Sequence, residues 1–296
     1  SGTGTFRYDF GRHEAVLENV KTRLNTADAA TWIGFGLPHD LAPYRFHAAP
    51  GVVLNGHIGH DNTHLDVLVD APGGMDYFFL KKTLSFPRIS GHLLFTEGLL
   101  RISDLAGTLY GGGLRGSAEI SLKRNAPGYS AKIEAENVDF ASLTKLYFNY
   151  DNSQGLLRGT FDFRGRNDDA RTLQGTGRIS VVNGDVFAIP VLGPFSGILN
   201  TIVPNMGYNI ARDASCSFDV RDGVIATDDF AVKGTGFEML GGGKLFFLDD
   251  KIDFTIRLNA QGVPGVLLFP VSKLFEYVSD GSLSKPAWRP KRLPSL

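Results

Sequence analysis

Short segments in which apolar and polar side chains alternate run through the whole chain, and they restrict the possible folds more than any other feature. Clear examples are Leu65–Val69, Ala118–Leu122, Gly159–Arg164 and Ile252–Leu258. A period of two places the apolar residues on one face of a β-strand, as in antiparallel sheets with one solvated face. Asn183-Gly184 and Asp222-Gly223 favour positive φ at both central residues and therefore predict two-residue hairpins. The sequence predicts a mainly β protein: a long, curved antiparallel sheet that forms a groove or taco-like shape, with a few short helices at its edges and end.

A long-range recurrence indicates how this sheet is organised along the chain. Three alternating arms end in Arg23-Leu24-Asn25, Ala135-Glu136-Asn137 and Arg257-Leu258-Asn259, with the asparagines 112 and 122 residues apart. Each arm is followed by a short helix-like run, so two stacked copies of one β-unit are the simplest interpretation. We therefore expect N-terminal strands and a short helix over 1–50, a divergent β-unit over 51–148, and a second β-unit over 149–296 with two apolar helices.

Four segments have helical character, and one segment is ambiguous. The expected helices cover Thr26–Ile33, Asp139–Phe148, about Phe195–Ile202, and Val266–Val278. The segment His13–Leu24 fits either a helix or a strand, and its analogy to the other asparagine-terminated arms favours a strand.

Composition excludes several classes of protein. Hydrophobic residues make up 43% of the 296 residues and charged residues 21%, which is typical of a globular chain. A net charge of −1 gives no general attraction to nucleic acid, and the single Cys216 excludes an internal disulfide framework. The uncharged stretch Val186–Ala211 is interrupted by prolines and glycines, so we do not interpret it as a membrane span. The chain opens directly on an alternating strand without a signal peptide, which suggests a piece of a longer polypeptide.

Sequence motifs of catalysis or nucleotide binding are weak. The run Gly111–Gly116 formally matches a dinucleotide-binding fingerprint, but a strand follows it where that fingerprint needs a helix, so we expect a corner between strands. The run Gly193–Gly197 lacks the pattern of a nucleophile elbow, and Cys216 alternates with Phe218 and Val220 as a small apolar residue would. We expect no enzyme activity and no cofactor.

One histidine cluster is a weak candidate for a metal site. His57, His60 and His64 lie close in sequence, and a turn at Asp61-Asn62 would bring His60 and His64 together. A strand without that turn would separate His60 and His64 by about 13 Å, too far for one ion. The simplest interpretation is a set of polar residues at an exposed turn, with no metal bound.

The apolar strand faces carry the functional interpretation. Many strands offer such a face, whereas only a few short helices are available to cover them, so part of the face should stay open as a groove that shelters acyl chains. The residues expected on this lipid-binding face are Phe218, Val220, Phe230, Val232, Ile252, Phe254, Ile256 and Leu258. The apolar helices supply candidate membrane contacts, which are Phe195, Ile198, Leu199, Leu267, Leu268 and Phe269, although packing against the sheet end is the simpler alternative.

Together, these motifs resemble a known family. The span Gly177–Pro290 is similar to the C-terminal region of AsmA-like proteins in its hairpins, its uncharged helix and its ending Gly281–Trp288. Val52–Phe148 resembles a more divergent copy of the same unit. The resemblance implies a periplasmic, β-rich envelope protein, membrane-anchored at full length and related to bridge-like lipid transfer proteins. It implies no catalytic residues.

We therefore expect a non-enzymatic envelope protein that binds or guides phospholipid, or another acyl-chain ligand, along an apolar β-groove. Such a protein would contribute to outer-membrane biogenesis or integrity and could contact a membrane. Two alternatives stay open at this point: a scaffold or adhesin-like module with a closed core, and a metal-dependent enzyme that uses the histidine cluster.

Overall fold

The computed structural model describes residues 2–11, 13–24, 44–59, 62–79, 82–96, 98–123, 127–166, 169–189, 192–195, 197, 211–234, 237–260, 276–283 and 285–291. Contacts divide the chain into two units. Unit 1 comprises 1–136 with 164–168, and unit 2 comprises 137–163 with 169–296.

The described elements are almost entirely strands. The first eleven are β1 (Thr3–Asp9), β2 (Glu14–Arg23), β3 (Tyr44–Phe46), β4 (Gly51–Ile58), β5 (His64–Ala71), β6 (Met75–Phe79), β7 (Lys82–Phe86), β8 (Arg88–Thr96), β9 (Leu99–Leu109), β10 (Gly112–Ser121) and β11 (Gly128–Asp139). After helix α3 (Phe140–Phe148) come β12 (Leu156–Arg166), β13 (Asp169–Val182), the short 3₁₀ helix η1 (Val186–Ala188), β14 (Ala211–Arg221), β15 (Val224–Gly234), β16 (Phe237–Phe246), β17 (Lys251–Ala260), β18 (Glu276–Gly281) and β19 (Pro286–Pro290).

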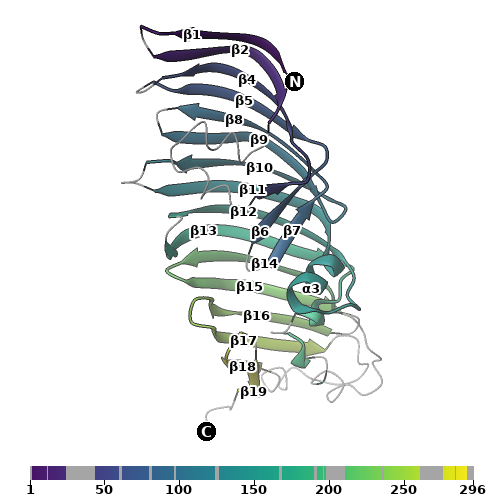
Figure 1. The fold of residues 1–296 in the computed structure, drawn as a ribbon. Coiled ribbons are helices and arrows are strands. Elements are labelled where there is room, and N and C mark those ends of the chain that lie inside the picture. The colour runs from purple at the N-terminus through teal and green to yellow at the C-terminus, as the bar shows by residue number, and fades with distance from the viewer. Residues whose placement is uncertain are drawn as a thin grey trace. The chain divides into compact units, whose positions relative to one another are not determined.

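Sixteen of these strands form one antiparallel sheet in the order β1-β2-β4-β5-β8-β9-β10-β11-β12-β13-β14-β15-β16-β17-β18-β19 (Figure 1). The remaining strands form a small sheet in the order β3-β6-β7. Most neighbours in the large sheet are joined by short connections, whereas longer segments join β2 to β4, β5 to β8, β13 to β14 and β17 to β18. The predicted mainly β fold with a long antiparallel sheet is therefore confirmed.

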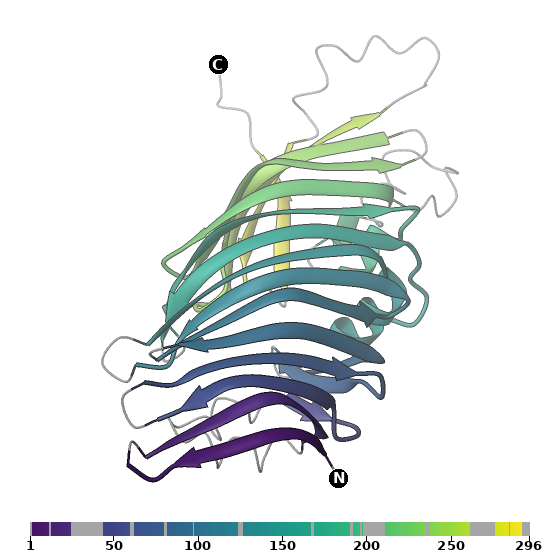
Figure 2. The same cartoon turned by 90° about the horizontal axis from the view of Figure 1, so that it is seen from above.

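The strands of each unit bend along their length, as Figure 2 shows. In unit 1 the pairing shifts between Leu17 and Val20 on β2 and between Ser90 and His92 on β8. In unit 2 it shifts between Thr227 and Phe230 on β15. Each shift inserts an unpaired residue, and such bulges bend a strand and increase its twist. Bulges in both units therefore account for the bending of the strands.

The small sheet lies on the apolar side of unit 1. Tyr77 on β6 is close enough to Tyr129 on β11 to influence its ionisation. Burial is the main cause that raises the pKa of Tyr129, and the charge of Tyr77 raises it further. Tyr110, in the turn between β9 and β10, has a hydrogen bond with the backbone of Ser85 on β7. The stacked rings of Tyr44 and Tyr77, 4.8 Å apart, join β3 to β6. We expected helices to cover the sheet, but in unit 1 a second sheet does so in part.

Several expected turns and helices are confirmed. Asp222 and Gly223 have φ values of 52° and 77° and join β14 directly to β15. The helix expected over Asp139–Phe148 is α3, whose first turn is capped where Asp139 Oδ2 accepts a 2.8 Å hydrogen bond from the Ser142 amide. The ambiguous segment His13–Leu24 contains strand β2, as predicted.

Two local predictions were wrong. Asn183-Gly184 does not close a hairpin, because β13 is followed by η1 and pairs with β14, which begins only at Ala211. Asn183 does adopt positive φ, but the Gly184 amide donates to the Arg212 carbonyl and so continues the pairing with β14. The end of the helix expected over Val266–Val278 is also wrong, since residues 276–278 belong to strand β18. The rest of that helix, the helix over Thr26–Ile33, and most of the one near Phe195–Ile202 fall outside the described residues.

Candidate functional site

In unit 2 the strand register brings the eight expected lipid-binding residues to one face. Val220 on β14 lies opposite Ile225 on β15, and Ile225 lies opposite Leu245 on β16, which in turn lies opposite Ile252 on β17. Residues opposite one another share a face, and so do alternate residues along a strand. The other pairs that place the set are Ala214–Val232, Val232–Met239, Met239–Leu258, Phe230–Gly241, Gly241–Ile256 and Gly243–Phe254.

Most of this face is covered. Val232 and Ile256 are 0% exposed, and the cluster that contains them also includes Val186 and Phe195 from the segment after β13. Phe195 is itself 0% exposed and packs edge-on against Tyr277 on β18 and Trp288 on β19, with ring centroids 5.6 and 4.7 Å away. Phe195, expected as a membrane contact, is thus part of a closed core. Ile198, Leu199, Leu267, Leu268 and Phe269 fall outside the described residues.

A half-buried aromatic cluster lies beyond this core. Phe161 on β12 lies 5.9 Å from Phe163 and 6.2 Å from Phe218 between ring centroids. The rings of Phe163 and Phe218 lie over glycines of β13: a Cβ atom on Gly175 would be 2.6 Å from Phe163 Cδ1, and one on Gly177 would collide with the Phe218 ring. The absence of a side chain at these glycines lets each ring lie close to the sheet while one side of it stays accessible.

Unit 1 presents apolar rows that run across its strands. One row crosses six strands through Leu54, Val67, Leu93, Ile102, Ala118 and Ala131. A second row passes through Leu65, Phe95, Leu100, Ile120 and Tyr129. At about 4.8 Å between neighbouring strands, the first row extends about 24 Å.

The unit 1 rows are only partly shielded from water. Leu54, Leu93, Ile102, Ala118 and Ala131 are all half-buried, whereas Leu65 and Val67 are buried. On β10 and β9 the opposite face is exposed and charged, with an ion pair of 2.8 Å between Arg101 and Glu119. The result is one wet face and one half-open apolar face, a pattern that differs from the closed core of unit 2.

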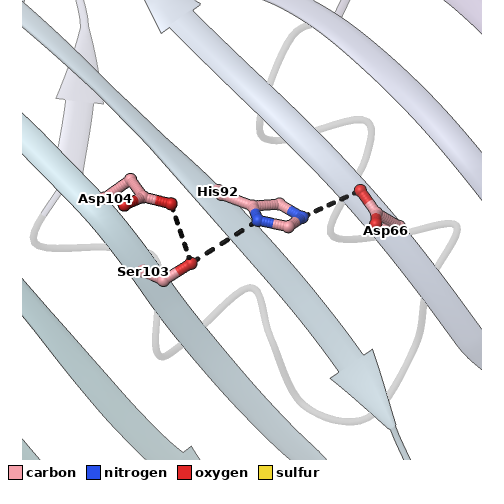
Figure 3. A network of polar contacts seen from close by, with 4 residues as sticks. All are labelled: Asp66, His92, Ser103 and Asp104. Carbon is pink, nitrogen blue, oxygen red and sulfur yellow. Dashed lines mark hydrogen bonds and ion pairs between the residues drawn. The ribbon is translucent and has the colours of Figure 1, made fainter.

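A polar network lies on the wet face of unit 1 (Figure 3). His92 Nε2 lies 2.9 Å from Asp66 Oδ1, and His92 Nδ1 lies 3.5 Å from Ser103 Oγ, which donates to Asp104. The order resembles a nucleophilic triad, but 3.5 Å is too long for a strong hydrogen bond between serine and base. These residues lie on β5, β8 and β9, which are interior strands whose backbone amides form hydrogen bonds within the sheet. We therefore interpret this cluster as a surface hydrogen-bond network. Beside it is a shallow hollow of about 720 Å³ lined by Lys21, Arg23, Leu68 and others.

The histidine cluster is arranged differently from the expected one. His57 and His64 are directly opposed on β4 and β5, with stacked rings 5.9 Å apart, and Glu14 Oε1 is 3.9 Å from His57 Nε2. His60 falls outside the described residues. Among the residues that the structure describes, no three His, Cys, Asp or Glu side chains are grouped to hold a metal ion.

The remaining motifs serve the fold. Tyr110 and Gly111 adopt φ values of 45° and 78° and form the turn between β9 and β10, as expected for a corner between strands. Cys216 is half-buried on β14, and burial, with a smaller effect from Asp229, raises the pKa of its thiol to about 11. Such a thiol is a poor nucleophile at neutral pH.

The sequence interpretation placed the candidate surface mainly in unit 2 and missed the rows of unit 1. Leu93, Ile102 and Ala118 each lie in alternating segments, so the signal was present in the sequence. However, the pairing register of the strands and the segments that pack over them decide which faces stay open. Neither can be predicted from the sequence of a single strand.

Comparison with known protein families identifies the family of the chain. The model of the AsmA family matches residues 82–240, more than half of the chain. No curated protein and no solved structure matches. Across the described residues, no helix has both the length and the apolar character that a membrane span requires.

Proposed function

The chain belongs to the AsmA family, which is associated with the cell envelope, and on that premise we propose that it binds lipid acyl chains along the apolar rows of unit 1. The family is not known as an enzyme family. The single observation that carries the proposal is the half-open row from Leu54 to Ala131, six strands wide. The half-buried aromatic cluster of Phe161, Phe163 and Phe218 in unit 2 offers a second surface of the same kind.

The dimensions suit a lipid tail. One leaflet of a bilayer is about 15 Å of hydrocarbon, and the row of about 24 Å accommodates that length. Burial of each methylene contributes about 0.8 kcal/mol, so ten methylenes against the row contribute about 8 kcal/mol before the cost of ordering the tail and the protein. A charged headgroup would stay in water at the rim.

The proposed setting is the periplasm, where the protein guides phospholipid and so contributes to outer-membrane biogenesis or integrity. The charged face that carries Arg101 and Glu119 suits an aqueous compartment on one side of the sheet. The buried core around Phe195 gives unit 2 a closed interior, which suits a stabilising role.

The test uses substitutions on the two faces of unit 1. Ile102→Asp combined with Ala118→Asp places two carboxylates in the apolar row, whereas Leu68→Asp makes the same kind of change on the opposite face, where Leu68 is 50% exposed. Phe254 and Ile256 are less suitable because they are 6% and 0% exposed core residues, and a carboxylate there would unfold unit 2.

Each purified variant is extracted with organic solvent, and phospholipid per protein is measured by mass spectrometry, with circular dichroism as the check of folding. The double variant should bind at least about tenfold less lipid than the unaltered chain while it keeps the β signal in circular dichroism. The Leu68→Asp variant should bind as much lipid as the unaltered chain. Equal lipid in all three proteins, or none in the unaltered chain, would refute the proposal. Unfolding of the double variant would instead favour a scaffold module with a closed core.

A further inference from the structure

Tyr129 ends the second apolar row of unit 1 with a polar group. In this row it follows Phe95, Leu100 and Ile120, and it lies directly opposite Ile120 on β10. Tyr129 is the second residue of β11, so it lies close to the strand end, at the border of the apolar face. A tyrosine suits such a border because its ring is apolar and its hydroxyl is polar.

The hydroxyl of Tyr129 has no hydrogen-bond partner among the residues that the structure describes. The side chain is half-buried, and burial is the main cause that raises its pKa. Other tyrosines in this part of unit 1 use their hydroxyls within the fold. The Tyr77 hydroxyl has a hydrogen bond with Tyr44, and the Tyr110 hydroxyl has one with the backbone of Ser85. A tyrosine hydroxyl that leaves bulk water usually has a partner, so the free donor at Tyr129 indicates a ligand.

The position of this donor indicates which group of a lipid it meets. From Leu65 on β5 to Tyr129 on β11 the row spans four strand spacings, or about 19 Å, which is longer than the hydrocarbon of one leaflet at about 15 Å. In a glycerolipid the ester carbonyl oxygens are the first hydrogen-bond acceptors beyond the tail. A tail that lies along the row with its ester end at β11 brings these oxygens to the Tyr129 hydroxyl, while the headgroup stays in water.

From these observations we propose that Tyr129 Oη donates a hydrogen bond to an ester carbonyl oxygen of the bound lipid, an inference that rests on the proposed function. This contact makes the site selective for ester-linked lipids. An ether-linked lipid has the same headgroup but a methylene in place of each carbonyl, so it leaves the Tyr129 hydroxyl without an acceptor. A site that hydrogen-bonds one group of its substrate discriminates against an analogue that lacks this group.

The test is titration calorimetry of the 296-residue chain with dioctanoyl phosphatidylcholine and with its di-O-octyl ether counterpart. One neutral hydrogen bond corresponds to about two- to tenfold in affinity, so the unaltered chain should bind the ether lipid about fivefold more weakly than the ester lipid. Tyr129→Phe keeps the ring and removes the hydroxyl. It should weaken binding of the ester lipid about fivefold and leave binding of the ether lipid unchanged.

Two further variants separate the hydroxyl from the apolar row. The matched control is Tyr8→Phe on β1, where Tyr8 is 42% exposed and lies opposite Ala15, and this variant should bind both lipids like the unaltered chain. Ile120→Ala removes apolar contact beside Tyr129, so it should weaken binding of both lipids by the same factor. In infrared spectra of carbonyl-labelled ester lipid, the unaltered chain should shift the carbonyl band to lower frequency, and Tyr129→Phe should not.

The outcomes distinguish this contact from the proposed function. If Tyr129→Phe binds both lipids like the unaltered chain while Ile120→Ala weakens both, the contact is overturned and the apolar row remains the lipid-binding face. Equal weakening of both lipids by Tyr129→Phe also overturns the contact, because the hydroxyl then acts on the shared phosphate or on the fold. An unaltered chain that binds neither lipid refutes the proposed function and this contact together.

Discussion

Substitution of Gly243 by alanine tests how the apolar face of unit 2 is packed. Gly243 lies on β16 opposite Phe254, with a φ of 156°, in a region that favours glycine. A Cβ atom there would lie 2.6 Å from Phe254 Cα and would also collide with the Asp253 carbonyl. An ordinary contact begins at 3.4 Å, so β17 would have to move by about 0.8 Å or more. Overpacking costs about 1–3 kcal/mol and an unfavourable backbone conformation about 1–3 kcal/mol, so we expect about 2–6 kcal/mol of destabilisation.

The matched control for this substitution is Gly113→Ala on β10. A Cβ atom on Gly113 would meet nothing within 4 Å, and alanine there should be neutral or slightly stabilising. The assay is urea unfolding followed by circular dichroism, in which a loss of 2 kcal/mol lowers the midpoint by about 0.7 M if the slope is about 3 kcal/mol/M. If Gly243→Ala and Gly113→Ala unfold at the same midpoint, the close approach of β16 and β17 is wrong.

Two further predictions concern titratable groups. Burial raises the pKa of the Cys216 thiol to about 11 from an ordinary value of 9.0, so about 1 in 1000 thiols is ionised at pH 8 instead of about 1 in 10. Maleimide should therefore label the native chain about 100-fold more slowly than the urea-unfolded chain. Equal labelling rates would contradict the burial of Cys216. The pKa of His47 is raised above 6.5, mainly by its hydrogen bond with Asp76 on β6. The stabilisation that this bond gives the small sheet is therefore complete below pH 6.5, and it is lost as the pH rises through the pKa of His47 in the folded protein. In an NMR titration Asp76→Asn should bring the His47 pKa back toward 6.5, and no change would exclude that hydrogen bond as the cause.

The sequence was sufficient to predict the type of sheet and many of its turns. Alternation predicted strands whose apolar residues, from Val220 to Leu258, do share one face. The dipeptide Asp222-Gly223 predicted its hairpin because both residues accept positive φ without help from the rest of the fold. Local chemistry decides these features, so a single sequence contains them.

The sequence could not predict which apolar faces would be covered. The segment that contains Phe195 packs against Tyr277 and Trp288, contacts between residues more than 80 positions apart. The small sheet of β3, β6 and β7 likewise lies close to β11 through Tyr77 and Tyr129, which are far apart in sequence. Asn183-Gly184 failed as a hairpin for the same reason, because its flanking strand pairs with a segment that begins 27 residues further on, at Ala211.

Glycine and phenylalanine together explain how a sheet can keep an apolar face without closing it. The chain contains 36 glycines and 22 phenylalanines, and in unit 2 the half-buried rings of Phe163 and Phe218 lie over Gly175 and Gly177. A phenylalanine that leans over a glycine of a neighbouring strand buries part of its ring without a second layer above it. A leucine or valine in place of the glycine would push the ring outward and would require such a layer. The cost of an open apolar face is therefore reduced within the sheet itself, which makes a surface for acyl chains compatible with a stable fold.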